Sequence, residues 1–401
     1  MKKIIILCAV IAAAALAGAG IWYGAIRLTG SRGAPVPPES DAVVTVPNPA
    51  NEAAQESPEK KPKEQKPTAI VQNLSIPWDI AFLPDGGMLV TERSGNLLLI
   101  ENGAAKKIPI PEAEHAGEGG LLGLDLHPYF ARKKYVYLYL TVRTGNGLIN
   151  RVVRYWFSNN ELSDPVTIID NIPGAQYHDG GRIRFGFSVA RPSGQEPYHY
   201  LYIATGDAGN PQNAQDTDSL AGKILRVHDD GSIPSDNPFG NAVWSYGHRN
   251  PQGLTWDTKG RLWATEHGRS GLASGFDELN LIEKGGNYGW PDSQGDSVAE
   301  GTIGPALHSG ANTTWAPASA VHWDGSIFFA GLAGETLYEA ILDEERVTEL
   351  KEHFVGEYGR LRTVTIGTDG MFYLTTSNRD GRGTINNGDD KIIRVNPAQF
   401  R

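Results

Sequence analysis

The feature of this sequence that most limits its fold is a hairpin pattern that occurs six times. Each copy contains a few alternating residues, a turn rich in Asp and Gly, and an apolar run that ends in Thr, Gly or a charged residue. Such a unit can bury its faces only against its neighbours, which is typical of the blades of a β-propeller. A long β-sandwich would not explain why the same charged corner ends the same hairpin. The copies span residues 79–100, 124–141, 181–209, 253–268, 320–342 and 364–381.

Composition agrees with an all-β chain. The 401 residues include 48 Gly, 25 Pro, 9 Trp and 15 Tyr, which suit turns and aromatic-rich strands better than a helical bundle. The chain is longer than most single domains, but β-propellers are themselves large. We therefore predict one six-bladed β-propeller over residues 68–401.

Two segments precede the predicted propeller. Residues 1–28 hold two lysines and the apolar run Ile4–Ile26, which is long enough to cross a bilayer of about 30 Å at ~1.5 Å per residue. The same run could be a signal peptide that is cut near Ala17 or Ala19. Cys8, the single cysteine, lies inside it, so the exported part is expected to have no disulfide.

Residues 29–67 are rich in Pro, Glu, Lys and Ala and show no apolar period. Such a segment cannot bury enough surface to offset its ordering entropy, so we expect a disordered linker. A linker of this kind is a suitable tether, which favours a retained membrane anchor over a cleaved signal peptide. We therefore expect the propeller outside the cytoplasm, anchored at the outer face of the cytoplasmic membrane, or secreted if the apolar run is cleaved.

The charge pattern limits the ligand. A formal net charge of -10 disfavours a general nucleic-acid binder, which needs a basic surface to displace counterions. An anionic ligand must therefore meet local positive charge. Charged corners follow the strands, and in a radial arrangement they converge at the mouth of the central channel. The pocket there is predicted to hold His178, Asp207, Arg249, Arg360 and Arg362.

Six motifs occur in a fixed order over nearly all of residues 70–395: GEGGLLGLDLHPYF, HDGGR, LAGKILRVHDDGSIPSDNPF, YGHRNPQGL, EHG with DELNLIEKGGNYGWP, and RLRTVTIGTDGMFYLTT. Together they resemble the glucose/sorbosone dehydrogenase family of soluble quinoprotein aldose dehydrogenases, which use pyrroloquinoline quinone (PQQ) with calcium. The stretches QYHDGGR and LAGETL are more similar to its aldose sugar dehydrogenase branch than to its soluble glucose dehydrogenase branch.

The resemblance implies oxidation of an aldose at the anomeric carbon to the lactone, with hydride transfer to PQQ and electrons passed to an acceptor that the sequence does not identify. His178 would take the proton from the anomeric hydroxyl, since a neutral imidazole is a suitable base near pH 7. Asp207 would orient His178 and stabilise its protonated form. Arg249 would stabilise the charge that develops on the quinone oxygens.

The resemblance also implies a set of cofactor contacts. Arg360 and Arg362 match paired arginines that bind the PQQ carboxylates, for which guanidinium groups are well suited. Ala333 stands where the glucose enzyme has a PQQ-binding lysine, which predicts weaker cofactor binding. The matched cofactor positions are Glu118 (a glutamine in the glucose enzyme), Arg249, Asn250, Thr314, Arg360 and Arg362.

Two calcium sites are implied in the same way. The backbone carbonyls of Gly268 and Arg269 would hold the Ca²⁺ that also binds PQQ, since calcium prefers oxygen ligands. The family usually has Gly-Pro there, so Arg269 departs from its pattern. A second, structural Ca²⁺ of the aldose branch would involve Glu278 and Tyr288.

Other functions stay open at this point. A non-catalytic propeller that binds a protein or a glycan, as in the hedgehog-interacting proteins of this family, would not need the His-Asp-Arg set. A calcium-dependent, lactonase-like hydrolase would recruit Glu118, Asp207 and Asn250. A nicotinamide enzyme is disfavoured, because no strand–GxGxxG–helix unit is present.

Each site residue also has a purely structural interpretation. Outside the family pattern, His178 is an ordinary loop histidine, and Arg360 and Arg362 are solvated charges on edge strands. His248 and His267 are predicted to be hydrogen-bonded structural residues rather than metal ligands, because no H-x-x-x-H pattern or Cys cluster accompanies them.

Overall fold

The computed structural model describes residues 66–189, 198–271 and 274–401, which all lie in one compact unit of the chain. The predicted apolar segment, its cleavage sites and nearly all of the predicted linker fall outside the described residues. Within the described ranges, no helix combines the length and the apolar character needed to cross a bilayer.

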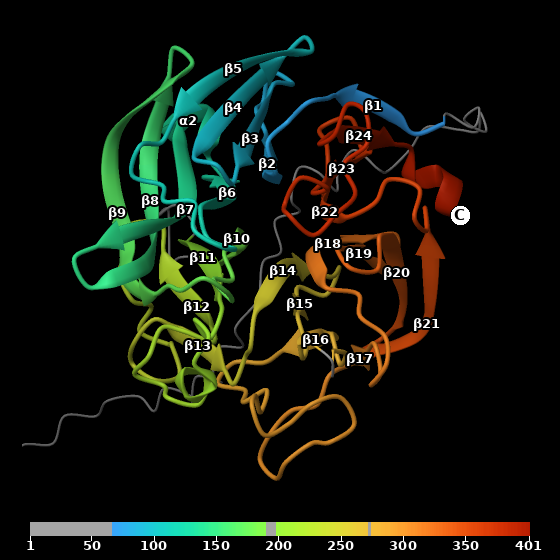
Figure 1. Cartoon of the computed structure of the whole chain (residues 1–401). Coiled ribbons are helices and arrows are strands. Elements are labelled where there is room, and N and C mark those ends of the chain that lie inside the picture. Colours follow the sequence, from blue (N-terminus) through green and yellow to red (C-terminus); the bar gives the residue numbers. More distant parts are fainter. Residues whose placement is uncertain (1–65, 190–197, 272–273) are drawn as a thin grey trace, which may run out of the picture. The chain divides into compact units, whose positions relative to one another are not determined.

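Six antiparallel four-stranded sheets make up this unit and surround a central axis (Figure 1). The first five sheets follow the chain, each built from four consecutive strands. Their strands are β2 (Pro77–Phe82), β3 (Met88–Glu92), β4 (Asn96–Glu101) and β5 (Ala104–Pro109); β6 (Leu121–Leu126), β7 (Tyr135–Thr144), β8 (Gly147–Ser158) and β9 (Glu161–Pro173); β10 (Ile183–Val189), β11 (Tyr198–Thr205), β12 (Lys223–His228) and β13 (Val243–Tyr246); β14 (Pro251–Trp256), β15 (Leu262–Glu266), β16 (Glu278–Ile282) and β17 (Leu307–His308); β18 (Pro317–Trp323), β19 (Ser326–Gly331), β20 (Thr336–Asp343) and β21 (Arg346–His353).

The sixth sheet joins the two ends of the described chain. Strand β1 (Thr68–Val71) pairs with β24 (Ile392–Val395), so the order is β1–β24–β23–β22, with β22 (Leu361–Ile366) innermost and β23 (Phe372–Thr376) next to it. The ring is thus closed by backbone hydrogen bonds between the first and the last strand. Short helical turns are few in the described residues: α2 (Phe130–Lys133), η1 (Pro211–Ala214) and η3 (Pro397–Phe400).

The strands are apolar on both faces because each sheet packs between two others. In β4, Leu97 and Leu99 belong to the core shared with the second sheet, while Leu98 and Ile100 belong to the core shared with the sixth. A core cluster of this kind lies between every pair of neighbouring sheets. Each fully buried Leu or Ile side chain contributes ~1.5–3 kcal/mol, so the sheets are stable only as a ring.

The inner strands carry the loops of interest to one end of the ring. Each inner strand contacts the inner strands of both neighbouring sheets. Pro251 pairs with Glu266 and Leu361 pairs with Thr376, so the loop that enters an inner strand lies beside the loop that leaves the second strand. The prediction of an all-β, six-bladed propeller is therefore confirmed, and each of the six repeated hairpins is the first strand pair of one sheet.

Candidate active site

A histidine–aspartate pair lies at the mouth of the propeller. The Nδ1 atom of His178 is 2.7 Å from Oδ1 of the buried Asp207, and Trp290 Nε1 donates to Oδ2 of the same carboxylate at 2.9 Å. Because a carboxylate only accepts hydrogen bonds, Nδ1 carries the proton and Nε2 is left to accept one. The His178 side chain keeps 18% of its surface exposed, so a substrate can reach it.

The loop of His178 is held in an unusual conformation. His178 has φ +63°, in the left-handed region that non-glycine residues seldom adopt. A Cβ atom at Gly206 would clash with the carbonyl group of His178, so only glycine lets the two loops approach this closely. The backbone amide of His178 donates to Glu118 Oε2 at 3.0 Å. Glu118, predicted as a cofactor contact, therefore also anchors the histidine loop.

The His-Arg-Asn corner links several of these loops. Glu266 accepts from the ring of His248, with 2.8 Å between Nδ1 and Oε2, and from the backbone amide of Arg249. The Arg249 carbonyl accepts from the amide of Asp207 at 2.8 Å, and Asn250 Oδ1 accepts from Gly180 N at 3.0 Å. The prediction that His248 is a hydrogen-bonded structural residue is confirmed.

The side chain of Arg249 has an unused donor. Its Nη2 donates to Ser270 Oγ at 2.9 Å and its Nη1 to the His267 carbonyl at 3.3 Å, while the buried Nε has no partner in the part of the chain that the structure describes. Burial lowers the pKa of Arg249, against the raising effect of Asp207. A buried guanidinium donor without a partner favours an oxygen acceptor supplied by a ligand.

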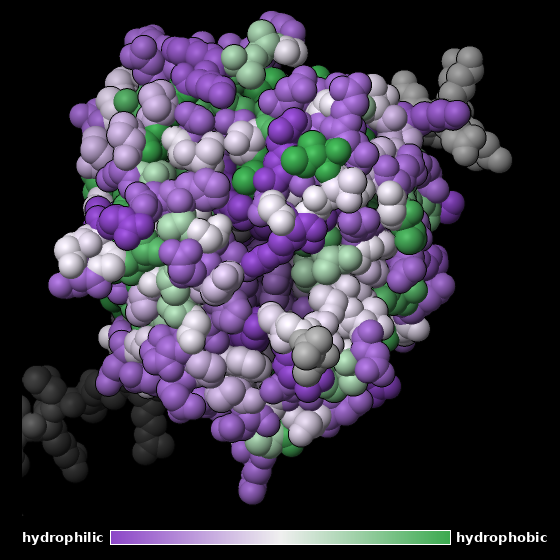
Figure 2. Space-filling view, in the orientation of Figure 1, coloured by the Kyte–Doolittle hydropathy of each residue, from purple (hydrophilic) through white to green (hydrophobic). Residues whose placement is uncertain are grey.

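Next to the pair lies a narrow cavity with polar walls, and Figure 2 shows hydrophilic residues gathered around the hollowed centre of one face. His267 is one of its walls, and its buried Nε2 has no hydrogen-bond partner among the described residues. Burial lowers the pKa of His267 to about 3, so the ring is neutral. His267 is predicted to be a hydrogen-bonded structural residue rather than a metal ligand, and its Nε2 has no such bond among the described residues. The lining residues are Trp78, Glu118, Asp179, Gly180, Gln252, His267, Leu332, Arg362 and Arg382.

The two predicted carboxylate-binding arginines are buried beside this cavity. Arg360 donates twice to Asp380 Oδ2, at 3.0 and 2.9 Å, and Arg362 donates to Gln252 Oε1 at 3.1 Å. Burial, together with the nearby charge of Arg93, lowers the pKa of Arg362 to about 9. Their interpretation as solvated edge-strand charges is wrong, because only 6% of Arg360 and 5% of Arg362 is exposed.

Comparison with known proteins assigns the family. The family model described as glucose/sorbosone dehydrogenase matches residues 74–387. The chain belongs to the glucose/sorbosone dehydrogenase family. The resemblance that the six motifs carry is therefore confirmed.

Several members of the glucose/sorbosone dehydrogenase family are similar to this chain, over between half and nearly all of their own length. An aldose sugar dehydrogenase of Escherichia coli is 32% identical over 366 residues, which cover 81% of this chain and 91% of that protein. Quinoprotein glucose dehydrogenase B of Acinetobacter calcoaceticus is 35% identical over 253 residues, which cover 56% of this chain and 52% of that protein. The solved structure of the PQQ-bound aldose sugar dehydrogenase from Streptomyces coelicolor has 37% identity and a TM-score of 0.74, with 82% of this chain and 96% of that chain covered.

The loop that contains Gly268 and Arg269 lies against the loop of Thr314. Asp277 accepts from the amide of Gly268 at 2.8 Å and from the amide of Trp315 at 2.6 Å, which joins the two loops. The Arg269 carbonyl accepts from Gly275 N at 3.3 Å. Among the described residues, no group of three or more His, Cys, Asp or Glu side chains could hold a metal ion.

Glu278 and Tyr288, the second predicted calcium pair, both lie near Glu266. Burial, followed by the charge of Glu266, raises the pKa of Glu278 to about 8. The ring of Tyr288 stacks on that of His248 at 4.6 Å, and its hydroxyl donates to the Leu281 carbonyl. The buried Oδ1 of Asn280 has no partner in the described residues.

Other residues at the mouth had no role in the sequence prediction. Arg93 is buried, with Nε 3.3 Å from His115 Nε2, and Arg382 reaches Glu118 from the last sheet. Trp290 comes from a long loop after β16. In the sequence, Arg93 and Arg382 stand out only because they lie in glycine-containing corners. Their position does not show which other loops they contact in the folded chain.

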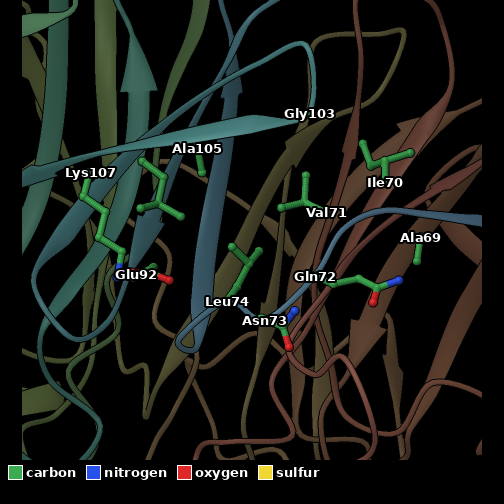
Figure 3. Close-up of a pocket in the computed structure, with 11 residues that line it drawn as sticks. Ala69, Ile70, Val71, Gln72, Asn73, Leu74, Glu92, Gly103, Ala105 and Lys107 are labelled. Atoms are coloured by element: carbon green, nitrogen blue, oxygen red, sulfur yellow. The ribbon is translucent and has the colours of Figure 1, made fainter.

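A larger groove of about 390 Å³ lies between β1 and β5 (Figure 3). Its charged members are Glu92 and Lys107, and the Glu92 carboxylate already accepts from Ser75 N at 2.7 Å. None of the predicted site residues lines it. The chemistry of the family therefore has no counterpart in this groove.

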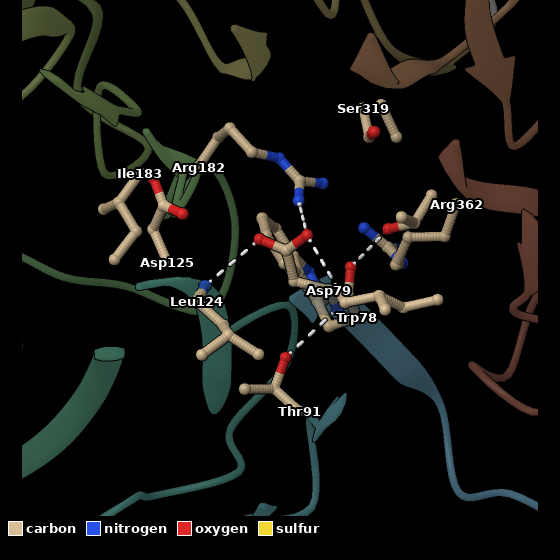
Figure 4. Close-up of polar contacts among 12 residues, drawn as sticks. Trp78, Asp79, Thr91, Leu124, Asp125, Arg182, Ile183, Ser319 and Arg362 are labelled. Atoms are coloured by element: carbon tan, nitrogen blue, oxygen red, sulfur yellow. Dashed lines mark hydrogen bonds and ion pairs between the residues drawn. The ribbon is translucent and has the colours of Figure 1, made fainter. Parts of the chain in front are cut away.

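A second cluster of buried charges lies among the inner strands (Figure 4). Asp79 is fully buried, with Arg182 Nη1 2.5 Å from Oδ1 and Arg184 Nη1 2.8 Å from Oδ2. Arg182 also lies 4.2 Å from the ring of Trp78, which lines the cavity. Despite burial, the charges of the two arginines hold the pKa of Asp79 below its usual value.

Proposed function

We propose that this protein is a PQQ-dependent aldose dehydrogenase that oxidises the anomeric carbon of a sugar to the lactone. The observation that carries the proposal is a base held by a carboxylate, His178 with Asp207 at 2.7 Å, beside a cavity with buried arginine donors. The family and the PQQ-bound relative from Streptomyces support the cofactor. A non-catalytic propeller would need neither the pair nor the arginines.

The residues of the mouth fit an anionic quinone. Arg249 Nε and His267 Nε2 are buried and have no hydrogen-bond partner in the described part of the chain, and a ligand rich in oxygen atoms would satisfy them. Arg360 and Arg362 would hold carboxylates, and Arg249 and Asn250 would contact the quinone oxygens. The hydroxyl of Thr314 would add a contact at the rim. When bound, PQQ supplies the two-electron acceptor that the protein itself lacks.

The side chains of the chain account for proton removal. The Nε2 atom of His178 takes the proton of the anomeric hydroxyl while the sugar loses a hydride, so the lactone forms with the loss of two electrons and two protons. Asp207 fixes the ring and stabilises the imidazolium that results. Glu118 keeps the histidine loop in its strained conformation through the His178 amide. Arg249 places positive charge where negative charge develops.

Calcium is part of the same proposal. The Gly268 carbonyl would be a ligand of the Ca²⁺ beside the quinone, and Arg269 would join it once its 3.3 Å bond from Gly275 opens. For a structural Ca²⁺, the raised pKa of Glu278 and the partnerless Asn280 Oδ1 support a cation near Glu278 and Tyr288.

We further propose that the propeller is tethered outside the cytoplasmic membrane by Ile4–Ile26. The support is the length of this apolar run and the Pro-rich stretch after it. Cell fractionation of the full chain is expected to find it in the membrane fraction. A product that is only soluble and begins near Gly18 or Gly20 would rule out the anchor and leave export intact.

The test of the function is reconstitution of the purified protein with PQQ and Ca²⁺, followed by an assay of a panel of aldoses with an artificial dye as electron acceptor. The proposal expects dye reduction that requires both PQQ and sugar. A protein that binds no PQQ would favour the non-catalytic propeller, and lactone hydrolysis without PQQ would favour the hydrolase. The assay also identifies the preferred sugar, and its natural electron acceptor is then sought among extracytoplasmic carriers.

A further inference from the structure

Arg382 crosses the mouth of the propeller from the last sheet to the second. It lies on the loop between β23 and β24, and its Nη1 donates to Glu118 Oε1 at 2.9 Å. Both residues line the cavity together with Arg362 and His267. The Arg382 side chain is 54% exposed, whereas that of Glu118 is 19% exposed. Arg382 is thus a cation on the open side of the cavity.

The buried arginines at or beside the cavity wall are bonded to buried partners. Arg360 donates to Asp380 and to the Leu332 carbonyl, and Arg362 donates to Gln252 and to Ser377 Oγ. In the structure as described, the Arg382 side chain has one ion pair, with Glu118. Arg382 can therefore change partner without disrupting a buried network.

The backbone of Arg382 is anchored to a buried residue, whereas its guanidinium is half exposed and pairs only with Glu118 among the described residues. Asp380 Oδ1 accepts from the amide of Arg382 at 3.0 Å, and its other oxygen accepts from two nitrogens of Arg360. The loop of Arg382 is therefore attached to the buried arginine next to the cavity. Because the backbone is fixed, the guanidinium of Arg382 can change its side-chain conformation and still lie beside the same ligand.

The charges at this point are not balanced. Asp380 and Glu118 act on the arginines around the cavity, and burial is the largest influence on Arg93 and Arg362. Four arginines lie here with three carboxylates, because Asp179 also lines the cavity. Positive charge is therefore in excess, and a ligand with negative charge lowers the repulsion among the arginines. These charged residues are Arg93, Arg360, Arg362, Arg382, Glu118, Asp179 and Asp380.

We infer that Arg382 is a further binding residue for the anionic cofactor. Its guanidinium leaves Glu118 and pairs with a carboxylate of PQQ when the cofactor binds, and Glu118 holds it in place when the cofactor is absent. This inference rests on the proposed function. A forked guanidinium–carboxylate pair with partial exposure is expected to change the affinity about tenfold.

Because Glu118 competes with the cofactor for Arg382, removal of its charge is expected to strengthen PQQ binding, whereas removal of Arg382 weakens it. Glu118→Gln removes the charge that holds Arg382, while its amide oxygen can still accept from the His178 amide. Cofactor binding is therefore expected to become a few-fold tighter. In a protein that already carries Arg382→Ala, the same change is expected to have little effect, because the competing partner is gone.

The experiment is a titration of the full chain with PQQ, followed by tryptophan fluorescence, for the wild type and five variants. Arg382→Ala is expected to raise the Kd about tenfold and Arg382→Lys about threefold, since lysine keeps the charge and loses the fork. The matched control is Arg379→Ala on the same loop, where the exposed arginine donates to the Asp389 carbonyl and does not line the cavity. It is expected to change the Kd less than twofold. The remaining variants are Glu118→Gln and its combination with Arg382→Ala.

The outcomes separate this inference from the function on which it rests. Equal affinities of Arg382→Ala and Arg379→Ala, with a wild type that binds PQQ, would overturn the role of Arg382 alone. If Glu118→Gln strengthens PQQ binding equally in the wild type and in Arg382→Ala, Glu118 acts only through its general charge. That result would overturn the exchange of partners by Arg382. A wild type that binds no PQQ would overturn the proposed function and this inference with it.

Discussion

Two clusters of buried charge lie in one propeller, and they differ in balance. Among the inner strands, Asp79 and Asp125 lie near Arg182 and Arg184, so each positive charge has a negative counterpart. Figure 4 shows Asp79, Asp125 and Arg182. At the mouth, arginines outnumber carboxylates, and burial with its like-charged neighbours lowers the pKa of Arg362 to about 9. The positive and negative charges of the inner cluster are therefore equal in number, although Nη2 of Arg182 has no hydrogen-bond partner among the described residues. The unbalanced cluster is expected to bind an anion, and we use this difference in net charge to separate a structural charge cluster from a candidate functional one.

The two acidic residues near the second predicted calcium position also form an unbalanced cluster, but here the excess charge is negative. Glu278 and Glu266 lie close together, and the pKa of Glu278 is raised to about 8 by burial and by that neighbour. An excess of negative charge favours a cation, as an excess of positive charge favours an anion. Imbalance therefore indicates the charge of the ligand as well as the presence of a site.

The largest effect is expected from the base. His178→Ala should bind PQQ, because its contacts lie on other residues, while sugar oxidation falls by a factor of ~10² to 10⁴. Steady-state assays of sugar oxidation, with PQQ binding measured on the same preparations, check both points. A wild-type rate in the variant would end the assignment of His178 as the base.

The balanced cluster is expected to matter for stability. Asp79→Asn leaves Arg182 and Arg184 without their carboxylate and should lower the free energy of unfolding by ~3–5 kcal/mol. The control is Asp170→Asn, which removes a half-exposed partner of Arg151, 3.1 Å away, and should cost ~0–1 kcal/mol. Denaturant unfolding measures both. Equal losses would show that burial and balance of the inner cluster are irrelevant.

The unbalanced cluster is expected to matter for binding. Arg362→Met should weaken PQQ binding by ~1.5–3 kcal/mol, because a charged hydrogen bond to a carboxylate is lost. It should destabilise the protein less than Asp79→Asn does, since removal of one arginine relieves repulsion from Arg93. Calorimetry and denaturant unfolding on the same preparations give both numbers. If Arg362→Met loses stability and keeps its PQQ affinity, Arg362 has a structural role rather than a cofactor-binding role.

The smallest effect concerns pH. Burial raises the pKa of Asp125 to about 6, although Arg184 lowers it. The folded state therefore holds a proton that the unfolded chain releases above ~3.9, so this group favours folding in acid and loses that effect as the pH rises to 6. Asp125 is only half-buried, so ~1 kcal/mol is expected. Asp125→Asn should lack this pH-dependent loss, and an identical slope in both proteins would contradict it.

Most of the fold follows from local sequence patterns. The hairpins are visible because turn residues and apolar runs lie next to one another in the chain, and the apolar runs are continuous because both faces are buried. The closure by β1 was not predicted. This strand has only four residues, TAIV, and its partner Arg394 for Thr68 is at the far end of the chain. Neither periodicity nor turn chemistry reports such a pairing.

The site was predictable in part for the same reason. His178, Asp207 and Arg249 were found because each lies in a distinctive corner, and the structure places their loops in contact. Their chemical roles stay predictions. The contact of Arg382 with Glu118 and the lack of a described partner for His267 Nε2 were not predicted. Both depend on which distant loops lie side by side around the ring. Local sequence patterns identify the charged loops at the strand ends. Which of these loops contact one another is determined by the closure of the ring.

The measurement that tests the central claim most directly is a calorimetric titration of PQQ into the wild-type protein at low and at high salt. If the unbalanced arginines of the mouth bind the anionic cofactor, binding is saturable at a single site, weakens as salt rises, and weakens further in Arg362→Met. The absence of saturable binding, or an affinity that neither salt nor Arg362→Met changes, would contradict the claim.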